Sequence, residues 1–352
     1  MKNMIIASLF FLSTLSYSQL TYVPDDNFEQ ALIDLGYDTP PLDDFVPTAN
    51  IENVTDLDVG SYGISDLTGI EGFTALTELW CDNNELTQID LTQNINLTYF
   101  VGSQNQLTTV NINNNIQLQS FICVGNQLNQ LDTSQNSILE SIIILNNQIS
   151  SLDLTQNPLL VTLSAPDNLI SNIDLSQNVL LEFFNLKGNQ LIVIDFSLNP
   201  ELILIFCENN QLESADIRNG NNENINIEGW FRMTNNPNLT CIFVDDIVYS
   251  TENWPDIDPT STFVETQAEC DLLATTSFKE SNFNLYPNPA INILNIETNT
   301  PFSKAEIYTT LGQKVVESSA KSIDISNLNA GLYLIIIEEE PGNTIVRRFI
   351  KK

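Results

Sequence analysis

The sequence contains no histidine among its 352 residues. This absence excludes Ser-His-Asp and Cys-His catalysis, and it leaves no histidine-based zinc site. Cysteines are present, but none forms a C-x-x-C pair, and no P-loop or G-x-G-x-x-G motif occurs. Paired carboxylates remain available for glycoside hydrolysis, yet the acidic residues recur at a regular spacing rather than in one irregular cluster. We therefore expect a protein that is not an enzyme and needs no cofactor.

Basic residues are scarce. The formal net charge is −33, and between Asn3 and Phe278 the basic residues are Lys187, Arg218 and Arg232. The segment from Phe283 onward is balanced, with seven acidic and seven basic residues. An acidic surface argues against binding to nucleic acid or to anionic lipid. Solubility outside the cell is a sufficient reason for such a charge; attraction to cationic partners or divalent ions is the functional alternative.

Long apolar runs are also missing, because no stretch reaches the roughly 20 residues that a membrane span needs. Residues 1–18 combine a basic Lys2, an apolar core from Met4 to Leu15, and small serines before the expected cleavage. This combination is typical of a secretory signal peptide. We expect a protein without a transmembrane segment that is secreted or lies on the outer cell surface.

The dominant feature that is present is a repeat. Between Leu76 and Gly220 the motif L-x-x-L-x-C-x-x-N-x-L-x-x-I-D-L-x-x-N-x-x occurs seven times with a constant period of 21 residues. The leading leucines are Leu76, Leu97, Leu118, Leu139, Leu160, Leu181 and Leu202. Two asparagine columns accompany them: Asn84, Asn105, Asn126, Asn147, Asn168, Asn189 and Asn210, and then Asn94, Asn115, Asn136, Asn157, Asn178 and Asn199. A fixed period of this kind predicts a solenoid of stacked coils.

This motif resembles the leucine-rich repeat. The resemblance implies a mainly β, right-handed solenoid over residues 51–220, whose parallel strands lie roughly 4.8 Å apart. Apolar residues two apart, such as Leu79 and Cys81, point inward from each strand. Asparagine in the turns can bond backbone groups that would otherwise be orphaned, so we interpret the asparagine columns as structural. The unit is too short to contain a long helix.

The flanks of the repeat differ from it. Residues 19–50 predict an N-terminal cap with a helix that starts at Asp26-Asn27-Phe28-Glu29, buries Phe28, Leu32 and Leu35, and ends at Gly36. The coil that follows contains I-S-D-L-T-G-I, which resembles the internalin-type repeat. After Gly220 the period fails. Residues 221–270 look like the C-terminal cap of secreted bacterial leucine-rich repeat proteins.

The five cysteines fall into two groups. Cys81, Cys123 and Cys207 occupy the inward sixth position of their repeats, and the nearest two are two coils apart, about 9–10 Å by strand spacing. That separation is beyond disulfide reach, so we expect buried free thiols. Cys241 and Cys270 lie outside the repeat of an exported protein, and we expect them to form a disulfide.

The C-terminal region has a different character. Residues 271–282 predict a linker, and residues 283–352 alternate like a small β-sandwich. The stretches L-Y-P-N-P-A from Leu285, I-Y-T-T-L-G-Q from Ile307, L-N-A-G-L-Y from Leu328 and the basic end closely resemble the type A C-terminal sorting domain of the type IX secretion system of Bacteroidota. The resemblance implies that the secretion machinery is a partner and that the tail is cleaved during export. A generic adhesive β-sandwich is the alternative.

The outward strand positions predict a binding surface. They lie two, four and six residues after each leading leucine and carry an apolar set: Trp80, Tyr99, Val101, Ile122, Val124, Ile143, Leu145, Phe183, Leu204 and Phe206. Exposed apolar patches tend to mark interaction sites, and aromatics suit their energetic centres. We expect a protein ligand outside the cell, or less readily a glycan, on this concave face, with adhesion as the biological role. A self-associating scaffold of the cell envelope would use the same face, and β-propensity alone also favours such residues.

An acidic column recurs fourteen residues after each leading leucine: Asp90, Asn111, Asp132, Asp153, Asp174, Asp195 and Asp216. Calcium between neighbouring carboxylates is conceivable. Turn capping or exposure to water is the simpler interpretation, and we expect no metal site.

Overall fold

The structure is a computed structural model that describes residues 19–225, 227–274, 283–298, 301–339 and 343–352. The chain forms two compact units. The first comprises Met1–Leu191 with Leu198–Asn210, and the second comprises Ile192–Ser197 with Gln211–Lys352. The expected signal peptide of residues 1–18 lies outside the described residues and stays a prediction.

A small cap begins the first unit. Its elements are β1 (Leu20–Tyr22), α1 (Asp26–Asp34), β2 (Phe45–Pro47) and α2 (Thr48–Ile51), and β1 pairs antiparallel with β2. Helix α1 starts at Asp26, as expected, and its cap is the preceding residue, Asp25. Asp25 has an extended backbone, and its Oδ1 accepts from the N–H groups of Asn27 and Phe28 at 3.0 Å. Capping of this type satisfies backbone donors that have no partner within the helix.

The buried face of α1 also differs from expectation. Phe28, Ala31 and Leu32 are fully buried, whereas Leu35 is 42% exposed. Leu35 is the C-cap residue, and Gly36 follows with φ +82°, so the chain turns away before Leu35 can reach the core. The cap is joined to the first coil through Asp25, whose Oδ2 accepts from the N–H and the hydroxyl of Ser65 at 2.9 and 2.7 Å.

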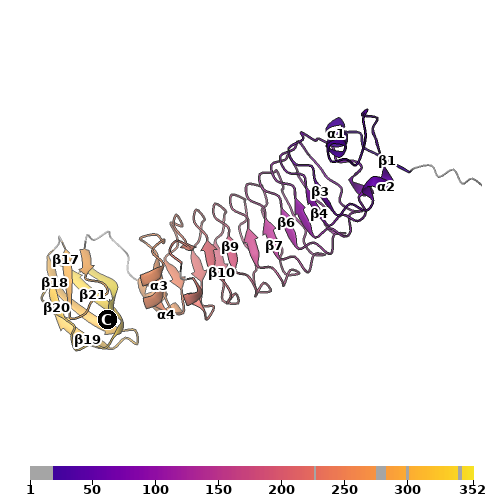
Figure 1. The fold of residues 1–352 in the computed structure, drawn as a ribbon. Helices are drawn as coiled ribbons and strands as arrows, with labels where there is room; N and C mark the ends of the chain where they lie inside the picture. The colour runs from indigo at the N-terminus through magenta and orange to yellow at the C-terminus, as the bar shows by residue number, and fades with distance from the viewer. Residues whose placement is uncertain (1–18, 226, 275–282, 299–300, 340–342) are drawn as a thin grey trace, which may run out of the picture. The chain divides into compact units, whose positions relative to one another are not determined.

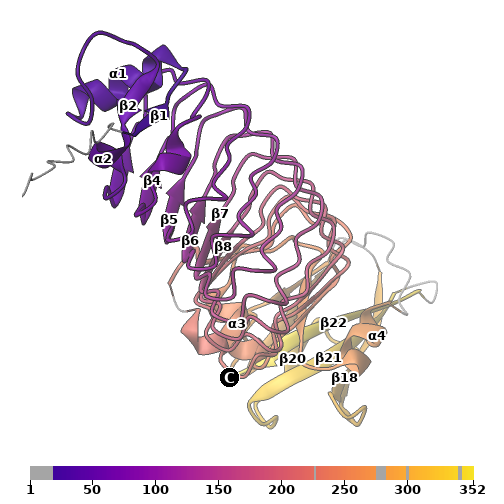
Figure 2. The same ribbon diagram turned by 90° about the vertical axis from the view of Figure 1, so that its right-hand side faces the viewer.

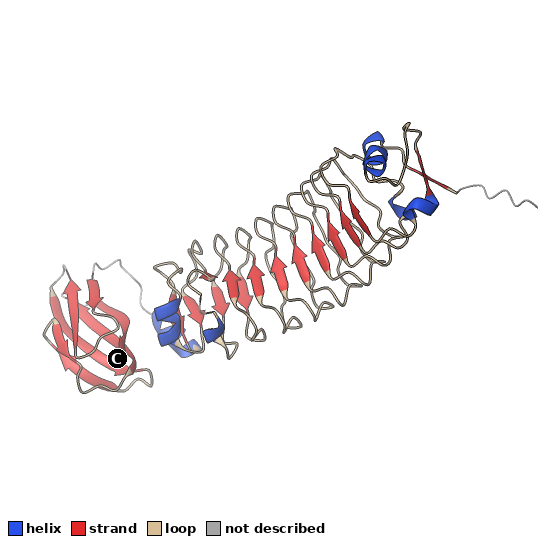
Figure 3. Ribbon diagram, in the orientation of Figure 1, coloured by secondary structure: helices blue, strands red, loops and turns tan. Residues whose placement is uncertain are grey.

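The rest of the first unit is a stack of coils, and Figures 1 and 3 show its short strands side by side. Adjacent strands pair in parallel, and each residue faces its counterpart 21 or 22 positions on. The strands are β3 (Asp56–Asp58), β4 (Glu78–Trp80), β5 (Tyr99–Val101), β6 (Ser120–Ile122), β7 (Ser141–Ile143), β8 (Thr162–Ser164), β9 (Phe183–Asn185) and β11 (Leu204–Phe206). A 3-10 turn, η1 (Ile70–Gly72), precedes β4. The predicted mainly β solenoid is confirmed.

The core of each coil is built from the positions that the motif predicts. All seven leading leucines are fully buried, and the middle residue of each of the strands β4 to β9 and β11 is buried as well. The inward sixth position is likewise buried at Cys81, Cys123 and Cys207, and none of these three forms a disulfide within the described residues. Burying an aliphatic side chain of this size stabilises the fold by about 1.5–3 kcal/mol, so repetition over the coils accumulates a large apolar contribution.

The first asparagine column forms a hydrogen-bonded ladder inside the turns. Asn126 shows the pattern: its Nδ2 donates to the carbonyl of Gly102 at 2.9 Å, and its Oδ1 accepts from the N–H of Leu107 at 2.9 Å. The same bonds recur at intervals of one coil, for example around Asn105, Asn147 and Asn168. Each side chain therefore joins two coils and satisfies backbone groups that the core would otherwise isolate from water.

The second asparagine column is fully buried and forms a ladder of another kind. Nδ2 of Asn136 donates to the carbonyls of Ile112 and Asn115, 24 and 21 residues earlier. Among the residues that the structure describes, its Oδ1 has no hydrogen-bond partner, and the same holds for Oδ1 of Asn94, Asn115 and Asn178. Asn157 differs, because Oγ1 of Thr133 donates to its Oδ1 at 2.7 Å. Thr133 occupies a position that is Leu154 in the next coil, so a single hydroxyl changes the environment of one amide.

The solenoid continues into the second unit beyond the expected end at Gly220. A parallel sheet there contains β10 (Val193–Asp195), β12 (Ser214–Asp216), β14 (Cys241–Phe243) and β15 (Thr262–Val264), in that order. Asn236 follows Asn210 by 26 residues instead of 21, and its Oδ1 accepts from the N–H of Leu212 at 3.1 Å as a further ladder residue. A five-residue insertion between the two asparagines therefore hid one more coil from the periodicity.

The remaining elements of this region close the apolar core. They are η2 (Asn222–Asn224), β13 (Phe231–Arg232), α3 (Ile247–Asn253) and α4 (Gln267–Ala274). Phe231 stacks on Trp254 with ring centroids 4.2 Å apart. A disulfide joins Cys241 to Cys270, as expected from their position outside the repeat, with Cα atoms 5.9 Å apart. Helix α4 extends to Ala274, so the expected linker from residue 271 starts later, and residues 275–282 lie outside the described residues.

The tail is a two-sheet β structure, as predicted (Figure 3). One sheet has the order β16 (Phe283–Tyr286), β17 (Ile293–Thr298), β20 (Ser322–Asp324). The other has the order β19 (Lys314–Ser318), β18 (Phe302–Thr309), β21 (Gly331–Glu339), β22 (Asn343–Lys351). All these pairs are antiparallel, and a separate apolar core that includes Leu294, Ile307, Ile335 and Phe349 lies within the tail.

The Thr133 hydroxyl gives the first testable prediction. We expect Thr133→Val to lower the free energy of unfolding by about 1 kcal/mol, because the shape is kept while Oδ1 of Asn157 loses its donor. The measurement is urea denaturation. At the equivalent position of the next coil, Leu154→Thr should be more stable than Leu154→Val by a similar amount, since the threonine hydroxyl would reach Asn178. Equal stability within both pairs would contradict this account of the ladder.

Candidate binding surface

The sheet face is the surface formed by the outward residues of β3 to β9 and β11, together with the residue two positions after each strand. From β4 onward, every strand alternates half-exposed, buried, half-exposed along its three residues. The ten residues expected to bind a ligand all lie at half-exposed positions of this face: Trp80, Tyr99, Val101, Ile122, Val124, Ile143, Leu145, Phe183, Leu204 and Phe206.

The strand register brings seven of these ten residues together. Across β4 to β7, each strand pairs one apolar outward residue with that of the next strand, in the order Trp80, Val101, Ile122 and Ile143. Val124 and Leu145 lie two residues further along neighbouring strands, and the rings of Trp80 and Tyr99 have centroids 5.6 Å apart. These residues form the aliphatic patch, with an aromatic pair at its N-terminal edge.

The other three residues form a second, smaller group. Phe183 is paired with Leu204, and Phe206 is paired with Asn185. The outward residues of β8, Thr162 and Ser164, stand between this group and the aliphatic patch. The sheet face therefore carries two apolar areas separated by a polar strip.

Charged residues border both areas. Asp56, Asp58, Glu78 and Asp82 lie around Trp80 at the N-terminal edge. At the other end, Nζ of Lys187 is 3.9 Å from Oε1 of Glu208, whose buried Oε2 has no hydrogen-bond partner among the described residues. The sequence prediction missed Asp56 and Asp58 because it assigned no outward positions to the degenerate first coil. The spacing of Leu57 and Val59 carries the signal that could have placed them, since it repeats the spacing of Leu79 and Cys81.

The acidic column has a structural role in its turns. Oδ1 of Asp153 accepts from the N–H of Thr155 at 3.0 Å, and Asp174 accepts from Ser176 at 2.9 Å. Hydrogen bonds from Thr155 lower the pKa of Asp153, and those from Ser176 lower the pKa of Asp174. Asn111 fills the same position and accepts from the N–H of Asn113 at 3.1 Å, so an amide serves as well as a carboxylate.

One group of three carboxylates in the described part of the chain comes close enough to share an ion: Asp26, Glu29 and Asp44. The buried Glu29 already accepts from the N–H groups of Asp43 and Asp44, at 2.7 and 3.1 Å. Those bonds fix the loop that covers α1, which accounts for the buried carboxylate without a metal.

The repeat cysteines offer no reactive thiolate. Burial raises the pKa of the Cys123 thiol to about 12, and burial also raises the pKa values of Cys81 and Cys207. A thiol that stays protonated at neutral pH is neither a good nucleophile nor a good metal ligand. These residues therefore act as small apolar core residues.

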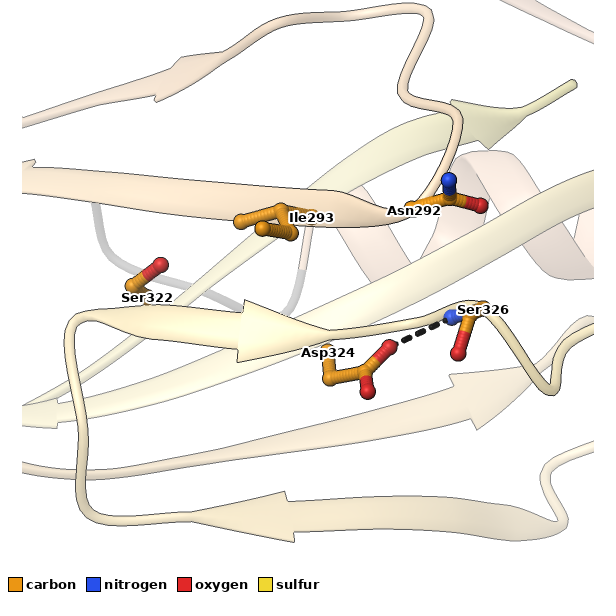
Figure 4. Close-up of a pocket in the computed structure, with 5 residues that line it drawn as sticks. All are labelled: Asn292, Ile293, Ser322, Asp324 and Ser326. Carbon is orange, nitrogen blue, oxygen red and sulfur yellow. Dashed lines mark hydrogen bonds between the residues drawn. The ribbon is translucent and has the colours of Figure 1, made fainter.

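A shallow depression in the tail is drawn in Figure 4. It is lined by Asn292, Ile293, Ser322, Asp324 and Ser326, and Oδ1 of Asp324 accepts from the N–H of Ser326 at 2.9 Å. Asp324 and Ile293 are paired residues of β20 and β17. The carboxylate thus stabilises the turn after β20.

The stacked parallel coils, their asparagine ladders and their buried leucines define a leucine-rich repeat solenoid. Residues 284–352 match the family model described as the secretion system C-terminal sorting domain. This match indicates export by the type IX secretion system to the cell surface or the surroundings. Among the described residues, no helix has the length and apolarity to cross a membrane.

The chain is similar to internalins and to another bacterial leucine-rich repeat protein. Internalin J of Listeria monocytogenes is 36% identical over 73 residues, which is 21% of this chain. The chain matches 8% of the length of that curated relative. Among solved structures, internalin C2 of the same species is 19% identical, with 65% of this chain and 99% of that chain covered and a TM-score of 0.48. A leucine-rich repeat protein of Leptospira interrogans is 22% identical, with 59% and 55% covered and a TM-score of 0.47.

The turn carboxylates of Asp153 and Asp174 predict that the folded protein loses stability as the pH falls. Their pKa values are lower in the folded protein than in the unfolded chain, so their stabilising contribution is present above the ordinary carboxyl pKa and is lost as the pH falls below it. Asp153→Asn with Asp174→Asn should keep both turns and reduce the fall in melting temperature between about pH 5 and about pH 2. Glu85→Gln with Glu201→Gln, two exposed acids without this role, is the matched control. An equal fall in all three proteins would show that the column does not cap its turns.

Proposed function

We propose that the solenoid is a non-catalytic binding module that recognises a protein outside the cell through the sheet face, with adhesion as its role. The observation that carries the proposal is the aliphatic patch. Its members are half-exposed side chains that stand in register on a sheet held rigid by two hydrogen-bonded ladders. A rigid apolar surface loses little conformational entropy when a partner docks, so most of its burial contributes to affinity.

The types of side chain in the solenoid and on its sheet face support the same function. The solenoid contains no histidine and its thiols are buried, so we propose binding without turnover. A protein partner suits aliphatic residues better than a glycan does, because sugars are bound mainly through hydroxyl hydrogen bonds and aromatic stacking. Trp80 and Tyr99 offer one aromatic pair, at the edge of the patch and not at its centre.

Self-association through the same face is the second candidate. A scaffold of the cell envelope would bury the aliphatic patch against a second copy, in an isologous contact. Light scattering of the exported protein separates the two candidates: a stable dimer that Ile122→Glu dissociates favours the scaffold, and a monomer favours a different partner.

The double variant Ile122→Glu with Ile143→Glu tests the surface. Both positions are half-exposed, so the free energy of unfolding should change by about 1 kcal/mol or less. Capture of extracellular proteins by the immobilised protein should nevertheless be lost, because each carboxylate would be buried unpaired against the partner.

The matched control is Ile95→Glu with Ile116→Glu. These isoleucines are 54% and 53% exposed in turns next to the second ladder, one coil apart and away from the sheet face. The control should bind as the unsubstituted protein does. If the sheet-face variant unfolds, its residues belong to the core. If it folds and captures the same proteins as the control, the ligand binds elsewhere.

A further inference from the structure

The N-terminal edge of the sheet face carries four carboxylates on two adjacent strands and the residue after them. Asp56 is directly paired with Glu78, and Asp58 is directly paired with Trp80. Asp82 follows β4, and the Cβ position of Gly60 lies 3.2 Å from its Oδ1, which places this carboxylate beside the end of β3. Asp56 and Asp58 are exposed, and Glu78 and Asp82 are half-exposed.

No cation within the described residues neutralises this edge. None of the eight ion pairs of the described chain includes any of these four acids. Carboxylates directly opposite each other on neighbouring strands repel, so the pairing of Asp56 with Glu78 costs stability in the unbound protein. The hydroxyl of Thr55 donates to Oδ2 of Asp56 at 2.6 Å, and this hydrogen bond removes only part of that cost.

The rest of the face does not balance the charge. Lys187 is the one basic residue at the outward positions of β3 to β11, and it lies at the far end beside Glu208. The charged residues at the outward positions are therefore mostly acidic, and four of them lie at the edge that carries Trp80 and Tyr99. Aromatic ring faces attract cations as well, which adds to the carboxylates at the same place.

We propose that the occupant of the sheet face is a basic polypeptide segment. Its apolar side chains would cover Val101, Ile122 and Ile143, and a lysine or arginine would lie over Trp80 between the four carboxylates. This inference rests on the proposed function and adds the chemistry of the partner. Binding removes the repulsion between Asp56 and Glu78, and an arginine guanidinium could bond two of the carboxylates at once.

A side chain fits this edge better than a divalent ion does. Ca²⁺ needs six to eight oxygen ligands at 2.3–2.6 Å. In the described part of the chain, these acids do not bring three ligand atoms within 4.8 Å of one another. A lysine or arginine carries its charge on an apolar stem, so it can cover an aromatic ring and reach separated carboxylates together.

The experiment selects a phage-displayed library of random peptides on the immobilised full chain. We expect the enriched peptides to combine apolar residues with lysine or arginine and to contain few acidic residues. Their affinity should fall about tenfold or more for Glu78→Lys with Asp82→Lys, because like charges then meet across the contact. Binding should also weaken when the salt concentration rises from about 0.05 M to about 0.5 M.

Two further variants complete the design. Glu85→Lys with Glu201→Lys changes the net charge equally at exposed positions in turns, and it should bind the selected peptides as the unsubstituted chain does. Glu78→Gln with Asp82→Asn removes the charge without adding a cation, and it should give an intermediate loss if the lysine variant folds poorly.

The outcomes separate this inference from the proposed function. Enriched peptides that lack basic residues, or that bind the Glu78→Lys with Asp82→Lys variant unchanged, overturn the inference. If such peptides still lose binding to Ile122→Glu with Ile143→Glu, the sheet face remains the binding site. If selected peptides bind that isoleucine variant unchanged, the proposed function itself fails.

Discussion

The solenoid depends on the side-chain amides of asparagine more than on any other group. A 21-residue coil turns too tightly for its corner backbone groups to find partners in a helix or a long strand. The ladder residues supply those partners, and Asn126 alone bonds backbone groups of two earlier segments. An unpaired buried N–H or carbonyl costs about 1–3 kcal/mol, so each ladder residue prevents a penalty comparable to burial of a leucine. The leucines then fill a core whose corners are already satisfied.

This division of roles explains why the sheet face is open to functional variation. The inward positions and the ladders set the coil, and the outward residues of each strand contribute little to it. Trp80, Ile122, Ser164 and Phe206 occupy the same outward position in different coils without any change in backbone register. A surface with this freedom can acquire an aliphatic patch, a polar strip and an acidic edge independently of the fold.

The sequence predicted the structure correctly where a residue type recurs at a fixed spacing. The period placed Leu79 and Cys81 inward and separated the repeat cysteines by more than a disulfide can span. Cys241 and Cys270 lie outside the repeat, and they form the disulfide. The period could not identify Asn236 as a ladder residue, because a five-residue insertion separates it from Asn210 by more than 21 residues. The ladder hydrogen bond from the N–H of Leu212 to Oδ1 of Asn236 is nevertheless formed.

Local geometry explains the other differences. The cap of α1 is Asp25, the residue before the predicted start, because its backbone is extended. Leu35 follows the apolar spacing of α1, but the helix ends before it. The candidate surface was predictable as a set of outward residues. The spacing did not predict its division into two areas, because Thr162 and Ser164 occupy the same outward positions as the apolar residues of the neighbouring strands.

The dimensions of the sheet face restrict what a partner can look like. Ile143 on β7 and Phe206 on β11 are three strand steps apart, which is about 14 Å at the usual spacing of parallel strands. Trp80 and Phe206 are six steps apart, or about 29 Å. An extended chain covers about 3.3 Å per residue, so about nine residues crossing the strands would reach from the acidic edge to the second apolar area. A shorter segment could occupy the aliphatic patch and the acidic edge but not the area around Phe206. Contact with both areas therefore requires either a long extended segment or a folded partner with two separate apolar contacts.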